Sequence, residues 1–206
     1  MCFNSYTSLI SLLIGLIFCF LLWNEKGNSV KIISVLWTFV LLMQLFEWLI
    51  WLNQHSNKSI QLFLTKCTMI ANLLQPIVVV FLCVHFLPST YNLYLLGSLL
   101  FYISFMFIKL YYIRDPITYL TPSGSCKHLQ YDWWKNTSWE VLFYLIPIIA
   151  SILCCMRPLS LAIFESAYIL LTLFVSIIIY SCGIPSLWCW MAAFASLFTY
   201  IFVKII

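Results

Sequence analysis

Five polar residues lie inside or beside stretches of the chain that are otherwise apolar. Gln44 and Glu47 are one helical turn apart near the end of one stretch, and Lys66, Asn72 and Gln75 follow in the next. An ionisable group inside a bilayer costs about 3 kcal/mol, so such groups usually face a partner or a water-filled cavity. A carboxylate, an amine and amides together predict a site that binds an ion or a small polar solute.

The geometry of a hairpin brings most of these residues to one depth. The two stretches are expected to form antiparallel helices joined near Asn57. Folding the chain there places Glu47 opposite Lys66, and Gln44 close to Asn72. The sequence therefore predicts one polar layer near the membrane surface on the side of the amino terminus.

A proline and two tryptophans belong to the same predicted site. Pro76 removes a backbone N–H and so frees the carbonyl one turn earlier, at Asn72. Trp48 and Trp51 flank Glu47 and are able to wall a pocket or stack on a cation. The alternative interpretation is structural: the charges neutralise each other, the amides bridge helices, and the tryptophans belong to an interfacial belt.

Two other groups of residues are candidates for catalysis or metal binding. Removal of Met1 would leave Cys2 with a thiol and an α-amine, a possible nucleophile and base. Cys126, His128 and Asp132 offer two or three ligands, but the second pair of ligands that a zinc site needs is missing. Neither pattern is specific, so enzyme activity stays uncertain and the sequence favours a protein that is not an enzyme.

The remaining polar and aromatic residues are assigned structural positions. Glu165 lies inside a later apolar stretch, where Arg157 or water is expected to satisfy it. Trp37 and Trp188 lie near predicted helix ends, where an indole prefers the membrane interface.

The elements that must position these residues are membrane-spanning helices. Of the 206 residues, 64% are hydrophobic and 8% are charged, and the mean hydropathy is +1.04. The apolar runs are continuous, whereas barrel strands alternate between faces. The sequence predicts an all-α polytopic membrane bundle in a single domain over 1–206, with seven helices at 7–23, 32–52, 67–87, 91–113, 139–156, 160–181 and 187–203 and a long loop at 114–138.

The orientation of this bundle is left open by two conflicting signals. An odd number of crossings puts the chain ends on opposite sides, and a weak excess of basic residues favours a cytoplasmic amino terminus. The glycosylation sequons at Asn57 and Asn136 fall on the same side, and their use would require the opposite orientation.

Several short motifs follow one another along the chain. The motifs are Met1-Cys2-Phe3, Met43-Gln44-x-x-Glu47 with Trp51, Asn72-x-x-Gln75-Pro76, Cys126-x-His128-Leu129 with Trp133 and Trp134, and Ser186-Leu187-Trp188-Cys189-Trp190. In these motifs the chain resembles an uncharacterised family of multi-pass membrane proteins from large nucleocytoplasmic DNA viruses. The resemblance covers essentially the whole chain. It implies a viral origin, a helical membrane fold, and a host or virion membrane as the location, and it lends no catalytic residue.

Three functions are compatible with the sequence. The first is a viral membrane protein whose one-sided polar pocket binds or senses a small solute or ion. The second is a structural or interaction protein of a viral or host membrane, and the third is a membrane enzyme that uses Cys2. The predicted partners are the lipid bilayer and the small ligand; no nucleic acid and no cofactor is predicted, and an oligomer stays possible.

Overall fold

Eight helices and one pair of very short strands make up the part of the chain that the computed structural model describes, residues 5–54, 58–87, 90–112, 118–120, 129–131, 138–179 and 184–206. The helices are α1 (Ser5–Trp23), α2 (Asn28–Leu52), α3 (Lys58–Phe86), α4 (Asn92–Tyr112), α5 (Ser138–Cys155), α6 (Leu159–Ile179), α7 (Ile184–Ala193) and α8 (Ala195–Ile205). Strands β1 (Thr118–Leu120) and β2 (Leu129–Tyr131) pair antiparallel, with Thr118 opposite Tyr131.

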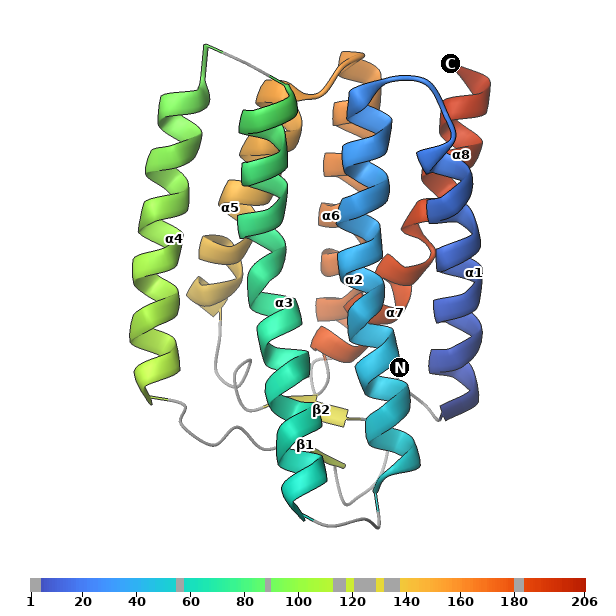
Figure 1. Cartoon of the computed structure of the whole chain (residues 1–206), viewed down its shortest axis with the longest axis vertical. Helices are drawn as coiled ribbons and strands as arrows, with labels where there is room; N and C mark the ends of the chain where they lie inside the picture. The colour runs from blue at the N-terminus through green and yellow to red at the C-terminus, as the bar shows by residue number, and fades with distance from the viewer. Residues whose placement is uncertain are drawn as a thin grey trace.

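The long helices stand side by side and alternate in direction (Figure 1). α1, α3 and α5 rise from the lower end of the bundle, and α2, α4 and α6 return to it. α7 and α8 together run upward, so α1 starts at the lower end and α8 finishes at the upper one (Figure 1). The two strands lie at the lower end, and α4 forms one edge of the bundle.

The predicted helical bundle is confirmed, with differences of detail. α3 begins at Lys58 and not at residue 67, because residues 58–66, in which polar and apolar side chains are mixed, continue the helix. The predicted loop 114–138 contains the strand pair. The predicted helix 187–203 is two helices, and only five helices, α1 to α4 and α6, are both long and apolar enough to span a membrane by length and composition among the described residues.

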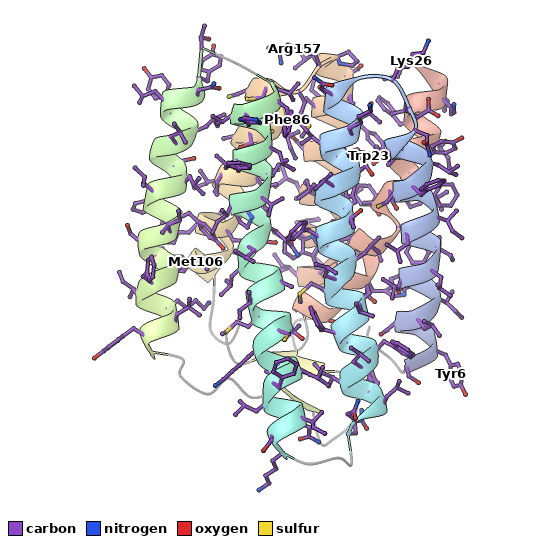
Figure 2. The ribbon with its side chains drawn as sticks, viewed as in Figure 1. Tyr6, Trp23, Lys26, Phe86, Met106 and Arg157 are labelled. Atoms are coloured by element: carbon purple, nitrogen blue, oxygen red, sulfur yellow. The ribbon has the colours of Figure 1, made fainter. Side chains whose placement is uncertain are left out.

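The distribution of side chains is the reverse of that in a water-soluble protein. Large apolar side chains point outward, as at Leu93 and Phe107, which are 78% and 70% exposed. Polar side chains such as Thr68, Ser151 and Ser176 are buried. Figure 2 shows the outward side chains along the ribbon, with Lys26 and Arg157 at the opposite end from Tyr6. An apolar exterior and five long apolar helices indicate an integral membrane protein.

A stripe of small side chains on α1 allows α2 to approach closely. Ser8, Ser11, Gly15 and Cys19 follow one another at helical spacing and are all buried. The Ser34 hydroxyl of α2 donates a hydrogen bond to the Cys19 carbonyl at 2.7 Å. In lipid the hydrophobic effect does not bring helices together, so close packing of small residues and interhelical hydrogen bonds hold this pair.

The helical segment that ends the described chain is interrupted at Phe194, between α7 and α8. The Phe194 N–H donates to the Met191 carbonyl at 3.1 Å, and the Tyr168 hydroxyl donates to the same carbonyl at 2.8 Å. Beyond the break, the Ser196 hydroxyl donates to the Gly15 carbonyl at 3.0 Å. Hydrogen bonds to α6 and α1 therefore hold the two helices in place at an interruption that no proline or glycine imposes.

One exposed ion pair ties the end of α8 to the segment after α1. The Lys204 ammonium lies 2.6 Å from the Glu25 carboxylate, and the Lys204 side chain is 51% exposed. Exposed pairs contribute little to stability. We expect Lys204→Gln to leave the thermal midpoint of the detergent-solubilised protein unchanged within error, as Lys26→Gln should. A clear drop confined to Lys204→Gln would show that this pair holds α8 in place.

Candidate functional site

A small cavity lies where five helices meet inside the bundle. Its volume is about 30 Å³, which accommodates about one or two water molecules. The lining side chains come from α2, α3, α5, α6 and α7: Leu36, Trp37, Val40, Asn72, Gln75, Tyr144, Ile148, Ile169, Trp188 and Ala192. A mainly apolar and aromatic wall with a few polar groups is typical of small-molecule sites.

Two helices with an internal proline supply the amide and hydroxyl groups of this wall. Pro76 directly follows Gln75 in α3, and Pro147 lies one turn after Tyr144 in α5. The Tyr144 hydroxyl donates a hydrogen bond to the side-chain carbonyl of Gln75 and joins the two helices. Pro76 also lacks the backbone N–H that would otherwise pair with the Asn72 carbonyl. The polar wall therefore coincides with two places where regular helical bonding is interrupted.

A buried carboxyl group lies behind the cavity wall. Trp37 lines the cavity, and its indole N–H donates to Glu165 Oε2 at 3.1 Å. The other carboxyl oxygen, Oε1, lies 2.5 Å from the Thr199 hydroxyl, which is itself 2.8 Å from the Ala195 carbonyl. Glu165 has no exposed surface. This network connects α2, α6 and α8 next to the cavity.

The predicted pairing of Arg157 with Glu165 is therefore wrong. The Arg157 guanidinium donates to the Met156 carbonyl at 2.7 Å, at the upper end of the bundle (Figure 2). Trp37 and Thr199, from α2 and α8, occupy the carboxyl oxygens. Distances along the sequence could not reveal these two partners, because both come from other helices.

The indole of Trp188 has a separate partner on α6. Its N–H donates to the Thr172 hydroxyl at 3.2 Å, and its ring meets the Tyr144 ring edge to face, with centroids 5.7 Å apart. Trp37 and Trp188 thus line the same cavity and donate to different residues of α6. This difference makes each tryptophan a matched control for the other.

A second polar cluster lies between α1 and α2. The Ser11 hydroxyl is placed to donate to Gln44 Oε1 at 3.0 Å, and the Gln44 amide nitrogen donates to Glu47 Oε2 at 2.9 Å. The side chains of Gln44 and Glu47 have no exposed surface. Neither residue lines the central cavity.

The register of the predicted hairpin agrees with the structure. Met43 of α2 packs against Ala71 of α3 as a separate buried pair, and these residues are equally far along the chain from position 57. The polar layer predicted from this register is divided between two places. Asn72 and Gln75 line the cavity, whereas Gln44 bonds to Glu47 and to Ser11 of α1.

The three other predicted ligand-binding residues are not among those that line the cavity. Lys66, Trp48 and Trp51 are partly exposed. The indole nitrogen of Trp51 is buried and has no hydrogen-bond partner.

Sequence reasoning missed three aromatic residues of the cavity. Trp37 was predicted at the interface but is only 3% exposed, because α2 begins at Asn28 and places Trp37 well inside the helix. Trp188 lies within α7 and lines the cavity. Tyr144 was not predicted, although a proline, Pro147, follows it one turn later in an apolar helix.

Several predicted candidates lie outside the described residues. These are Cys2, Asn57, Cys126, His128, Asp132 and Asn136. Within the described ranges, no three histidine, cysteine, aspartate or glutamate side chains come together as a metal site.

No protein-family model, curated protein or solved structure matches this chain. Inferences about its function therefore rest on its own residues and their geometry.

Proposed function

We propose that the chain is an integral membrane protein that crosses the bilayer seven times and binds a small polar solute in its central cavity. The observation that carries this proposal is the convergence of amide, hydroxyl and indole groups from separate helices on one internal space. Burying polar groups in the interior of a membrane bundle costs free energy, and the polar groups that are found there commonly contact a ligand. In this proposal α7 and α8 together form the seventh crossing as a broken helix.

The size and chemistry of the cavity favour a small monovalent cation as the ligand. The volume of about 30 Å³ restricts the occupant to the size of about one or two water molecules. Asn72 and Gln75 carry amide oxygens, and the aromatic residues Trp37, Tyr144 and Trp188 line the same space, a combination that is able to bind a small cation. None of the lining side chains is cationic, so an anion would lack a counter-charge, whereas a cation would lie one residue, Trp37, away from the Glu165 carboxyl group. Ammonium and the alkali cations fit these requirements.

We further propose a viral origin and a location in a host or virion membrane. Support comes from the motif Asn72-x-x-Gln75-Pro76 and from Trp188, which belong to the resemblance and also contribute residues to the cavity wall. Infection by a virus that carries a tagged copy would place the protein by microscopy. Its absence from both purified particles and infected-cell membranes would contradict this assignment.

Ligand binding is tested by thermal unfolding of the full chain in lipid nanodiscs. Ammonium, potassium and sodium chloride are compared with choline chloride, whose cation is too large for the cavity, at equal ionic strength. A ligand at 100 times its Kd stabilises the folded state by about 2.7 kcal/mol. We expect at least one small cation to raise the thermal midpoint in a saturable manner.

A filled cavity provides the matched control for this experiment. Ala192→Val adds two methyl groups at the cavity wall and should abolish the stabilisation by the small cation. Ala150→Val makes the same change on α5 away from the lining and should retain it. If all four salts act alike on the unmodified chain and both variants, the cavity binds no small cation and a purely structural role is the better explanation.

The number of crossings is tested by two epitope tags that flank α5. One tag is inserted within residues 121–128 and the other beside Arg157. If α5 crosses the bilayer, antibodies added to sealed membranes should reach one tag and not the other. Access to both tags from one side would show that α5 does not span.

A further inference from the structure

Two close oxygen–oxygen contacts lie beside the Glu165 carboxyl group, and each needs a hydrogen between its two oxygens. If Glu165 were ionised, one of these hydrogens would be missing. The Thr199 hydroxyl carries a single hydrogen. It lies 2.5 Å from Glu165 Oε1 and 2.8 Å from the Ala195 carbonyl, and only one of these oxygens can receive that hydrogen fully. If Glu165 is protonated, its O–H donates to Thr199, Thr199 donates to Ala195, and the Trp37 N–H donates to Oε2. A neutral acid accounts for every contact.

The surroundings of Glu165 also favour the neutral acid. The side chain has no exposed surface, and within the described residues Trp37 and Thr199 are the groups that bond to its oxygens. Lys204, the basic residue of α8, pairs with Glu25 instead. An ionised carboxylate that contacts no cationic group is strongly unfavourable in an apolar interior.

The titratable group next to Glu165 on its own helix is engaged with another helix. Tyr168 lies one turn along α6, and its hydroxyl donates to the Met191 carbonyl of α7. From α2 and α8, the groups that face the carboxyl are the Trp37 indole and the Thr199 hydroxyl, neither of which titrates. Proton exchange at this position therefore belongs to Glu165.

We propose that Glu165 is an intramembrane proton-binding site that is linked through Trp37 to the occupant of the central cavity. Trp37 is the residue shared by the two sites: it lines the cavity, and it donates to the carboxyl. The linkage rests on the proposed function, whereas the proton site itself does not.

The linked step exchanges one positive charge for another. When a small cation enters the cavity, the O–H bond of Glu165 breaks, the proton passes to water, and the carboxylate balances the cation. Trp37 keeps its donated hydrogen bond to the carboxylate throughout. The net charge of the interior is the same with the proton on Glu165 as with the cation in the cavity. The electrostatic cost of each state therefore stays low.

Infrared spectroscopy of the full chain in nanodiscs tests the proton site. A protonated carboxylic acid has a carbonyl stretching band well separated from the carboxylate bands. We expect such a band at neutral pH, its loss in Glu165→Gln, and its retention in Glu25→Gln, which alters an exposed carboxylate. Survival of the full band in Glu165→Gln, or its absence from the unmodified chain, would overturn the proposal.

The partners of the acid are tested with matched pairs of variants. Trp37→Phe and Thr199→Val remove the groups that contact the carboxyl, so each should shift the acid band. Trp188→Phe and Thr172→Val remove the neighbouring tryptophan–threonine bond and should leave the band in place. Equal shifts in both pairs would contradict the assignment. These variants also keep the test decisive if Glu165→Gln does not fold.

The linkage is tested with a pH-sensitive dye in weakly buffered nanodisc samples. Potassium or sodium chloride, added in place of choline chloride, should release up to one proton per protein, and Glu165→Gln should abolish the release. Stabilisation by a cation without proton release would refute the linkage and leave the cavity's ligand intact. Loss of the acid band in Glu165→Gln together with no cation effect would support the proton site and refute the proposed ligand.

Discussion

Gly15→Leu should leave little or no folded protein. A Cβ atom at this position would overlap the Leu41 side chain and come within 2.8 Å of the Ala193 carbonyl oxygen. Leu41 is able to adjust, but the carbonyl lies at the α7–α8 break, where Ser196 bonds to the Gly15 carbonyl. The smaller change Gly15→Ala should reduce the free energy of unfolding by about 1–3 kcal/mol. Thermal unfolding of detergent-solubilised protein measures both.

Gly97 provides the control for this prediction. It lies within α4, and a Cβ atom there would meet nothing within 4 Å. Alanine is a better helix former than glycine, so Gly97→Ala should leave stability unchanged or slightly increase it. Similar losses for Gly15→Ala and Gly97→Ala would show that the contact between α1 and the helix break does not govern stability.

Trp37→Ala is expected to destabilise the protein by about 3–5 kcal/mol, the range for removing a large buried aromatic side chain. Trp37 is 3% exposed, its ring meets Tyr168 edge to face, and its N–H satisfies Glu165. The substitution enlarges the cavity and removes a donor at the same time. Chemical unfolding in mixed micelles gives the free energy difference.

Two comparisons separate these contributions. Trp37→Phe keeps most of the packing and removes the donor, so its loss of stability should be clearly smaller than that of Trp37→Ala. Trp23→Ala removes a tryptophan that is 49% exposed and should have little effect. If Trp23→Ala destabilised the protein as much as Trp37→Ala, burial at the cavity would not explain the result.

The helices and their register could be predicted because they depend on local properties. In lipid only helices and closed barrels satisfy their own backbone hydrogen bonds, and continuous apolar runs fit helices because barrel strands alternate between faces. A short connection near position 57 fixed the depth at which Met43 meets Ala71. Asn72 and Gln75 were correctly placed in the interior because polar side chains are costly against acyl chains.

The rotation of each helix about its axis could not be predicted in the same way. α2 is apolar on nearly all sides, so the positions of its apolar residues do not distinguish the face with Trp37 from the lipid-facing one. The partners of Glu165 come from α2 and α8 and depend on that rotation. The α7–α8 break likewise depends on contacts with α1 and α6, at Gly15 and Tyr168, and has no breaker residue of its own.

The positions of α1 and α8 restrict how copies of this bundle can be joined. α1 starts at one end of the bundle and α8 finishes at the other (Figure 1). In the seven-crossing arrangement proposed above, a second copy of the bundle joined after α8 through a short linker would insert upside down relative to the first. Such a tandem would be an inverted repeat, formed without the extra helix that a bundle with α1 and α8 starting and finishing on one side would need.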